Sequence, residues 1–188
     1  MTGIDPKLDN SENESKFDNT GSEPKLDNTG IESKLDNIGR EPKLDNDLFF
    51  VCSLIEYIGR TTNNRRADVV SALGKDVLAR YLELADVYHC EPIVNTATDL
   101  IEKCGITKGN FDNTAGIPNV PTVFDIAKVY KRLIVTIAKN SGAHPIDALI
   151  DVYSSWISDK ISDYGCSMFY ENPEYLYLSY IEGEPLKD

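Results

Sequence analysis

The chain has 188 residues, of which 41% are hydrophobic and 27% charged, a composition typical of a globular protein rather than a fibrous or membrane-embedded one. Its 31 acidic and 19 basic side chains give a net charge of −12, which counts against binding to nucleic-acid phosphates or anionic lipids. No apolar run approaches the roughly 20 residues of a membrane-spanning helix, and residues 1–12 lack the pattern of a secretory signal. We therefore expect a cytoplasmic protein with no membrane partner.

The first 47 residues contain five copies of a nine-residue unit, which begin at Asp5, Glu14, Glu23, Glu32 and Glu41. Each unit keeps a lysine, one apolar residue and an Asp-Asn pair, and its second position alternates between proline and serine. Nine residues turn a helix by about 900°, so successive apolar residues fall on opposite faces and form no stripe. With 12 acids, 6 bases and little apolar surface, residues 1–47 are predicted to be a disordered arm. The arm is interpreted as a spacer or, alternatively, as a docking site for a partner.

The remainder, residues 48–188, is predicted to be one all-α domain, because apolar residues recur at helical spacing and strand patterns are nearly absent. Asp47 is a suitable N-cap for the first helix, over 48–58, and Gly59 is expected to end it. Six more helices are predicted over residues 67–73, 76–89, 92–104, 122–141, 145–164 and 173–181. About seven helices with short turns indicate an irregular or orthogonal array.

One long connection, residues 105–121, breaks the helical pattern with three glycines and two prolines. Loops of this length are often functional. The loop also marks a possible division of the domain into residues 48–104 and 122–188.

Neither histidine belongs to a recognisable catalytic pattern. His89 is expected at a helix end, where it interacts with the last carbonyl groups, and His144 before Pro145 is expected to act as a loose helix cap. The four cysteines lack the short-range pairs of a zinc site and the framework of a disulfide-rich protein. Phosphate-binding glycine loops and nucleophile elbows are also missing from the sequence. We predict no catalytic residue, no metal and no cofactor, and we favour a non-enzymatic protein.

Two groups of side chains are candidates for binding. The candidate anion contacts are Arg65, Arg66, Lys128, Lys131 and Arg132. Asp125, one turn before Lys128, favours instead a solvated face with local ion pairs. The candidate partner surface is the aromatic C-terminal group Tyr170, Tyr175, Tyr177 and Tyr180. The alternative for these tyrosines is that the last helix folds back over the core.

Three stretches carry a resemblance to a known group: Leu48-Phe49-Phe50-Val51-Cys52-Ser53-Leu54-Ile55-Glu56-Tyr57, Val69-Val70-Ser71-Ala72-Leu73-Gly74 and Ala85-Asp86-Val87-Tyr88-His89. Over residues 48–104 the chain resembles small uncharacterised helical domains of Firmicutes and related bacteria, which are often encoded beside predicted toxin genes. The resemblance implies an accessory or antitoxin-like role and transfers no catalytic residue. The repeats and residues 105–188 lie outside it.

The function expected from the sequence is therefore that of a non-enzymatic interaction module whose partner is another protein. One alternative is a small-ligand-binding protein or enzyme with a pocket at loop 105–121, to which Lys128, Lys131, Arg132 or Tyr130 contribute. A second alternative is a weak anion or nucleic-acid binder, which the overall charge disfavours.

Overall fold

The computed structural model describes the backbone of residues 29–187 and the side chains of residues 43–187. Every regular element in this part of the chain is helical, which confirms the predicted all-α class. The helices are α1 (Thr29–Thr62), α2 (Arg66–Glu83), α3 (Ala85–Tyr88), α4 (Ile93–Lys103), α5 (Val123–Ser141), α6 (Pro145–Ser154), α7 (Trp156–Ile161), the 3-10 helix η1 (Met168–Tyr170) and α8 (Pro173–Glu182).

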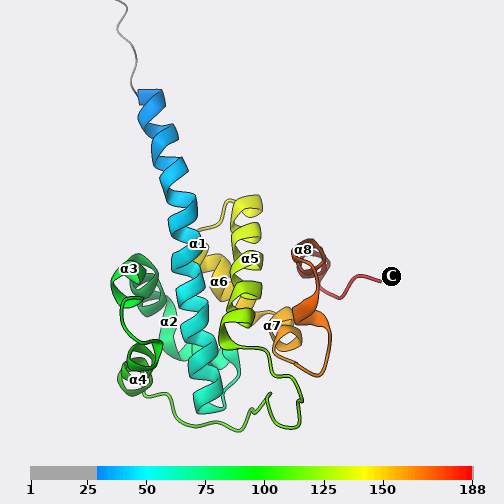
Figure 1. The fold of residues 1–188 in the computed structure, drawn as a ribbon. Coiled ribbons are helices and arrows are strands. Elements are labelled where there is room, and N and C mark those ends of the chain that lie inside the picture. Colours follow the sequence, from blue (N-terminus) through cyan, green and yellow to red (C-terminus); the bar gives the residue numbers. More distant parts are fainter. Residues whose placement is uncertain (1–28, 188) are drawn as a thin grey trace, which may run out of the picture.

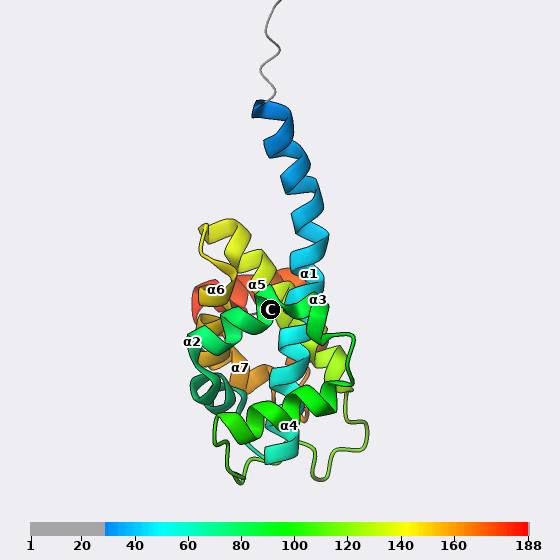
Figure 2. The ribbon, with the colours of Figure 1, turned by 90° about the vertical axis from the view of Figure 1, so that its left-hand side faces the viewer.

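Helix α1 is the central element of the domain. It packs against α2, α3, α4 and α5, while its first turns extend beyond the other helices (Figures 1 and 2). Leu48, Val51 and Ile55 are fully buried along its inner face. The predicted apolar segment is thus confirmed, but its predicted ends are wrong.

Asp47 does not cap α1, because the helix continues upstream of it. Lys43 Nζ lies 3.2 Å from Asp47 Oδ2 one helical turn later, and Leu44 packs against the core. The fifth repeat unit therefore enters the domain. Most of the predicted arm, residues 1–28, lies outside the described residues.

Three predicted helix ends are confirmed by their capping contacts. Thr122 and Asp125 form a reciprocal capping box at the start of α5, and the Nδ1 atom of His144 accepts the Ile146 N–H at 3.3 Å at the start of α6. Asn172 caps α8 by accepting the Tyr175 N–H at 2.8 Å.

Two internal breaks shape the remaining helices. Gly74, with φ 73°, kinks α2 at the position where the sequence predicts a helix end. The predicted helix over 145–164 is wrong, because Ser155 leaves the helical conformation between α6 and α7. The Ser155 hydroxyl donates to the Val152 carbonyl at 2.7 Å, a local contact that competes with the helical hydrogen bonds.

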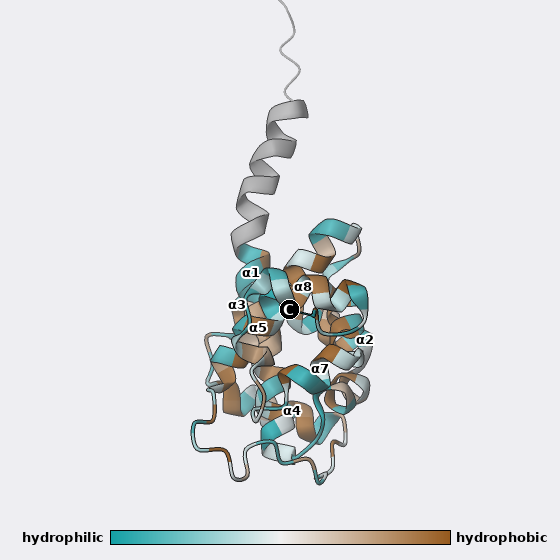
Figure 3. Cartoon of the chain, turned by 90° about the vertical axis from the view of Figure 1, so that its right-hand side faces the viewer, coloured by the Kyte–Doolittle hydropathy of each residue, from teal (hydrophilic) through white to brown (hydrophobic). Residues whose placement is uncertain are grey.

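The described residues share one hydrophobic core, which includes Leu100 before the long loop and Leu133 after it. The helices carry alternating hydrophobic and hydrophilic bands, as amphipathic helices around a common core do (Figure 3). Phe124 lies in the helix predicted over 122–141, and although it is apolar it is 49% exposed. Its position defines one of the two sites described below.

The fifth repeat unit, part of the predicted disordered arm, contacts the domain through Lys43 and Leu44 and should contribute to its stability. A chain that begins at Thr29 keeps Leu44 in place, whereas a chain that begins at Asp47 loses it. We expect the longer variant to have a higher thermal midpoint than the shorter one. The shorter one should lose on the order of 1 kcal/mol from the half-buried leucine. Equal midpoints in thermal unfolding would show that the fifth unit adds nothing.

Candidate functional site

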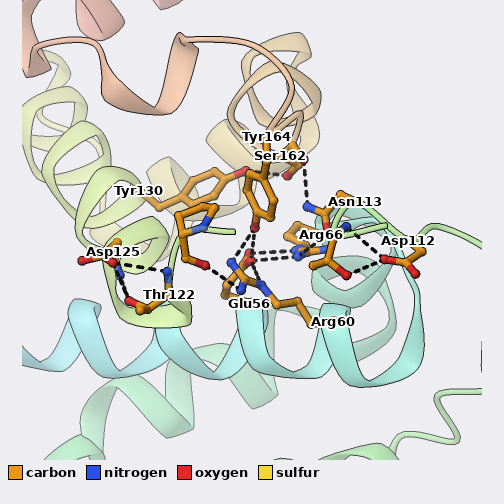
Figure 4. A network of polar contacts seen from close by, with 12 residues as sticks. Glu56, Arg60, Arg66, Asp112, Asn113, Thr122, Asp125, Tyr130, Ser162 and Tyr164 are labelled. Atoms are coloured by element: carbon orange, nitrogen blue, oxygen red, sulfur yellow. Dashed lines mark hydrogen bonds and ion pairs between the residues drawn. The ribbon is translucent and has the colours of Figure 1, made fainter. Parts of the chain in front are cut away.

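A buried ion pair joins the C-terminal half of α1 to the start of α2. The side chains of Glu56 and Arg66 are both 0% exposed, and Arg66 donates from Nε to Oε2 at 2.7 Å and from Nη2 to Oε1 at 2.8 Å. Arg60 Nε donates to Oε1 at 2.6 Å, and the Tyr164 hydroxyl donates to the same oxygen (Figure 4). Glu56 therefore accepts four hydrogen bonds, three of them from positive charges.

The charges around Glu56 keep it ionised. Burial acts to raise the pKa of this carboxyl, but the hydrogen bonds from Arg66 and the charges of Arg66 and Arg60 outweigh burial and lower the pKa below its ordinary value. Burial and the neighbouring Glu56 charge raise the pKa of Tyr164 to about 12, so its phenol stays a donor. The cluster is one carboxylate between two guanidinium groups. Its contacts hold α1, α2 and the segment after α7 together, and Glu56 and Tyr164 keep their protonation states at neutral pH.

Gly59 makes room for this arrangement. A Cβ atom at this position would lie 2.7 Å from Arg66 Cδ and 2.9 Å from Arg66 Nε, and Arg66 is held in place by Glu56. The sequence predicts Gly59 as a helix end, but it lies inside α1 and serves this close approach.

The same network holds the long loop. Arg60 Nη1 donates to the Pro121 carbonyl at 2.8 Å, and Arg66 Nη2 lies 3.4 Å from Asn113 Oδ1. Asn113 in turn donates to the Ser162 carbonyl at 2.8 Å (Figure 4). Loop 105–121 is irregular as predicted, but it is fastened to α1 and to the end of α7.

A cavity of about 520 Å³ lies beside this loop. Its lining includes Phe111, Asn113 and Tyr164, together with Arg65, whose guanidinium carbon lies 5.0 Å from the Phe111 ring centroid. Lys128, Lys131 and Arg132, which the sequence predicts as possible contributors, lie elsewhere on α5. The remaining lining residues among those described are Asp112, Ala115, Ile117, Asp159, Lys160, Ser162, Asp163 and Gly165.

Tyr130, the other predicted contributor to this pocket, is fully buried. Its hydroxyl lies 2.9 Å from the Ser158 hydroxyl and 3.3 Å from that of Ser162. It packs face to face with Tyr153, with ring centroids 4.1 Å apart. Tyr130 is therefore a core residue that supports α7, not part of the cavity wall.

A second cavity, of about 570 Å³, is lined by residues of α1, of α3 and of the start of α5; we call it the α1–α3–α5 groove. Its apolar lining consists of Phe49, Phe50, Ala85, Ile93 and Phe124. Its charged or polar lining consists of Lys43, Asn46, Asp47, Ser53, Asp86, His89 and Glu91. A cavity of this size is in the range that holds a small ligand or the anchoring side chains of a peptide.

The groove contains a pair of aromatic rings. Phe124 lies at the start of α5, and its ring centroid is 6.1 Å from that of Phe49 on α1. Although 49% of Phe124 is exposed, the ring is placed by contact with Phe49 and by the capped first turn of α5. An ordered, half-exposed aromatic ring beside an apolar cavity is typical of a binding surface.

The predicted anion contacts do not form one site. Arg66 is inaccessible to any outside anion because it is fully buried, so this prediction is wrong. Arg65 pairs with Asp159 at 2.6 Å, and Lys131 pairs with Asp45. Lys128 lies 3.6 Å from Asp125, as the alternative of local ion pairs predicts. Arg132 is exposed on α5.

The predicted tyrosine surface divides into two kinds of residue. Tyr170 is 72% exposed on η1, whereas Tyr175, Tyr177 and Tyr180 of α8 are half-buried and pack against the core. Helix α8 lies on α5, which agrees with the alternative that the last helix folds back.

Both histidines have the structural contacts predicted from the sequence. His89 Nδ1 lies 2.8 Å from the Ala85 carbonyl, and His144 caps α6.

Among the side chains of residues 43–187, no three His, Cys, Asp or Glu are grouped so that they could hold a metal ion. From Thr29 onward, no helix combines the length and apolar character needed to cross a membrane.

The site residues predicted from the sequence do not include Glu56, Phe49 or Phe124. A signal for Glu56 exists, since it is a carboxylate on the otherwise apolar side of α1 with Arg60 one turn later. Phe49 and Phe124 carry no such signal, because an aromatic residue at helical spacing normally indicates core.

Comparisons of the chain with protein-family models, with curated proteins and with solved structures find no match.

We predict that Glu56→Gln strongly destabilises the domain, because it leaves Arg66 buried without a countercharge. The expected loss at neutral pH is about 3–5 kcal/mol, measured by chemical denaturation. Glu184→Gln is a matched control, since Glu184 pairs with Lys187 on the surface, and it should leave the denaturation midpoint unchanged. A loss no larger than the control's would show that the pair is not the anchor of the fold.

The same variant should remove part of the pH dependence of stability. Because the pKa of Glu56 is lower in the folded state, its contribution is complete above the ordinary value of 4.5 and is lost as the pH falls through the folded-state value. The stability gap between the native protein and Glu56→Gln should therefore narrow below about pH 4.5. A gap that stays constant in acid would contradict this assignment.

Proposed function

We propose that the protein is a non-enzymatic protein-binding module that takes an apolar segment of its partner into the α1–α3–α5 groove. In line with the resemblance over residues 48–104, we further propose that the partner is a toxin encoded beside it. The observation that carries the proposal is the half-exposed Phe124 beside Phe49. Covering these rings removes apolar surface from water, which is the main driving force of association.

The charges of the groove define the kind of segment that fits. Among the described lining residues, Asp47, Asp86 and Glu91 face one lysine, Lys43, and the whole chain carries a net charge of −12. An acidic margin around an apolar floor favours a segment in which Lys or Arg accompanies an apolar anchor. The partner segment is therefore expected to be basic as well as apolar.

The surroundings of the Cys52 thiol and of the two histidines favour a role in binding rather than catalysis. Burial raises the pKa of the Cys52 thiol to about 12, so this thiol stays protonated at neutral pH. His89 and His144 are used at helix ends. The polar network at Glu56 is used to hold the long loop.

Phe124→Asp should abolish partner binding while leaving the fold intact, since the ring is half exposed and the new carboxylate adds to the acidic margin. The full chain and the variant are compared as baits in quantitative pull-downs from the native host, and in co-expression with the neighbouring gene product. Leu178→Asp is the matched control, because Leu178 is 41% exposed on α8, away from the groove. Equal capture by both variants, or no effect on the toxicity of the neighbour, would contradict the proposal.

A second candidate function rests on the cavity beside loop 105–121, which is where the sequence predicts a pocket. Its 520 Å³ and its mixture of Phe111, Arg65 and several carboxylates suit a small polar ligand. In a thermal-shift screen of small polar metabolites, at least one compound should stabilise the native protein but not Phe111→Ala. A screen in which every shift is the same in both proteins would remove this candidate.

A further inference from the structure

We propose that the α1–α3–α5 groove is occupied by a repeat unit of the same chain, residues 14–19, with Phe17 as its anchor. The unit would act as a built-in competitor of the partner. This inference uses the groove of the proposed function but does not depend on the identity of the partner.

The fifth unit already contacts the domain through its described side chains, which begin at Lys43. Lys43 of this unit lies 3.0 Å from Asp86 of α3, and Leu44 packs against the core. Asp45 pairs with Lys131 of α5. The lysine, the apolar residue and the aspartate are the positions that every unit shares, so each unit carries the groups that already bind this domain.

The segment Lys16-Phe17 is complementary to the groove in charge and in apolar character. The segment Lys16-Phe17 joins a positive charge to an aromatic ring, which are the two features that the acidic margin and the paired rings of the groove select. Asp86 is 58% exposed although it already pairs with Lys43, so it is accessible to a second lysine. Phe17 is the one aromatic residue among the five apolar anchors, and an aromatic ring gains additional energy beside Phe49 and Phe124.

Phe17 is close enough in sequence to reach the groove. Helix α1 begins at Thr29 and carries Phe49 twenty residues later, a rise of about 30 Å at 1.5 Å per residue. Phe17 lies twelve positions before Thr29, and a chain of that length can span up to about 40 Å when extended. The segment is therefore long enough to bring Phe17 to Phe49 and Phe124. Leu26, three residues from Thr29, is too close to return to the groove.

The test places the photo-crosslinking residue p-benzoylphenylalanine at position 17 of the full chain, at low protein concentration. We expect a monomeric product with bonds to peptides that contain Phe49, Ile93 or Phe124, and a several-fold lower yield of these bonds when Phe124→Asp is added. The same probe at position 35 is the control, since position 35 lies within α1, about 12 Å along the helix from Lys43. Bonds to the groove should not form from there.

Several results would overturn the inference. One is a yield of bonds to the groove that Phe124→Asp does not change. Another is a crosslinked dimer whose amount grows with protein concentration, which would make a second copy the occupant. A separate readout is partner capture by Phe17→Ser, which should increase because the competitor is lost; unchanged or lower capture also contradicts the inference. If crosslinking fails while Phe124→Asp still abolishes capture, the proposed function stands and the internal competitor does not.

Discussion

The buried pair between Glu56 and Arg66 is the interaction on which the rest of the domain depends. Two charges removed from water carry a desolvation cost of several kcal/mol each, and only complete satisfaction of their hydrogen-bonding groups offsets it. The offset here requires partners that are distant in sequence, because Glu56 also binds Tyr164, 108 residues later. The chain satisfies this pair only when α1, α2, the long loop and the segment after α7 are assembled together.

Helix α1 combines two tasks along its length. Its last two turns carry Glu56 and Arg60 of the polar network, and its middle turns carry the groove residues around Phe49, so the two sites share one rigid element. Phe49 is positioned by the same helix whose C-terminal end is held by the pair of Glu56 with Arg66. A groove built on packed helices is formed before a ligand arrives, and binding then loses little free energy to ordering of the protein.

The sequence predicts those parts of the fold that local chemistry determines. The predicted bounds of α5 and the predicted start of α8 agree with the structure, because the caps Thr122 and Asn172 and the left-handed Gly142 act within a few residues. The sites could not be predicted in the same way. The contacts of Glu56 link residues 10 and 108 positions apart, and helical periodicity reports only neighbours up to about one turn away. The exposure of Phe124 cannot be predicted from the sequence either, because it depends on which helices pack against the start of α5.

The repeat period itself limits how the units can contact the domain. Within one continuous helix, nine residues amount to two and a half turns, so adjacent units present their apolar residues on opposite faces. Because Leu44 packs against the core, the unit before it in the same helix is out of phase with that contact. A further unit can therefore reach the domain only where the chain leaves the line of α1 and turns back. The nine-residue period thus favours one docked unit joined to α1 and additional units that approach from outside it.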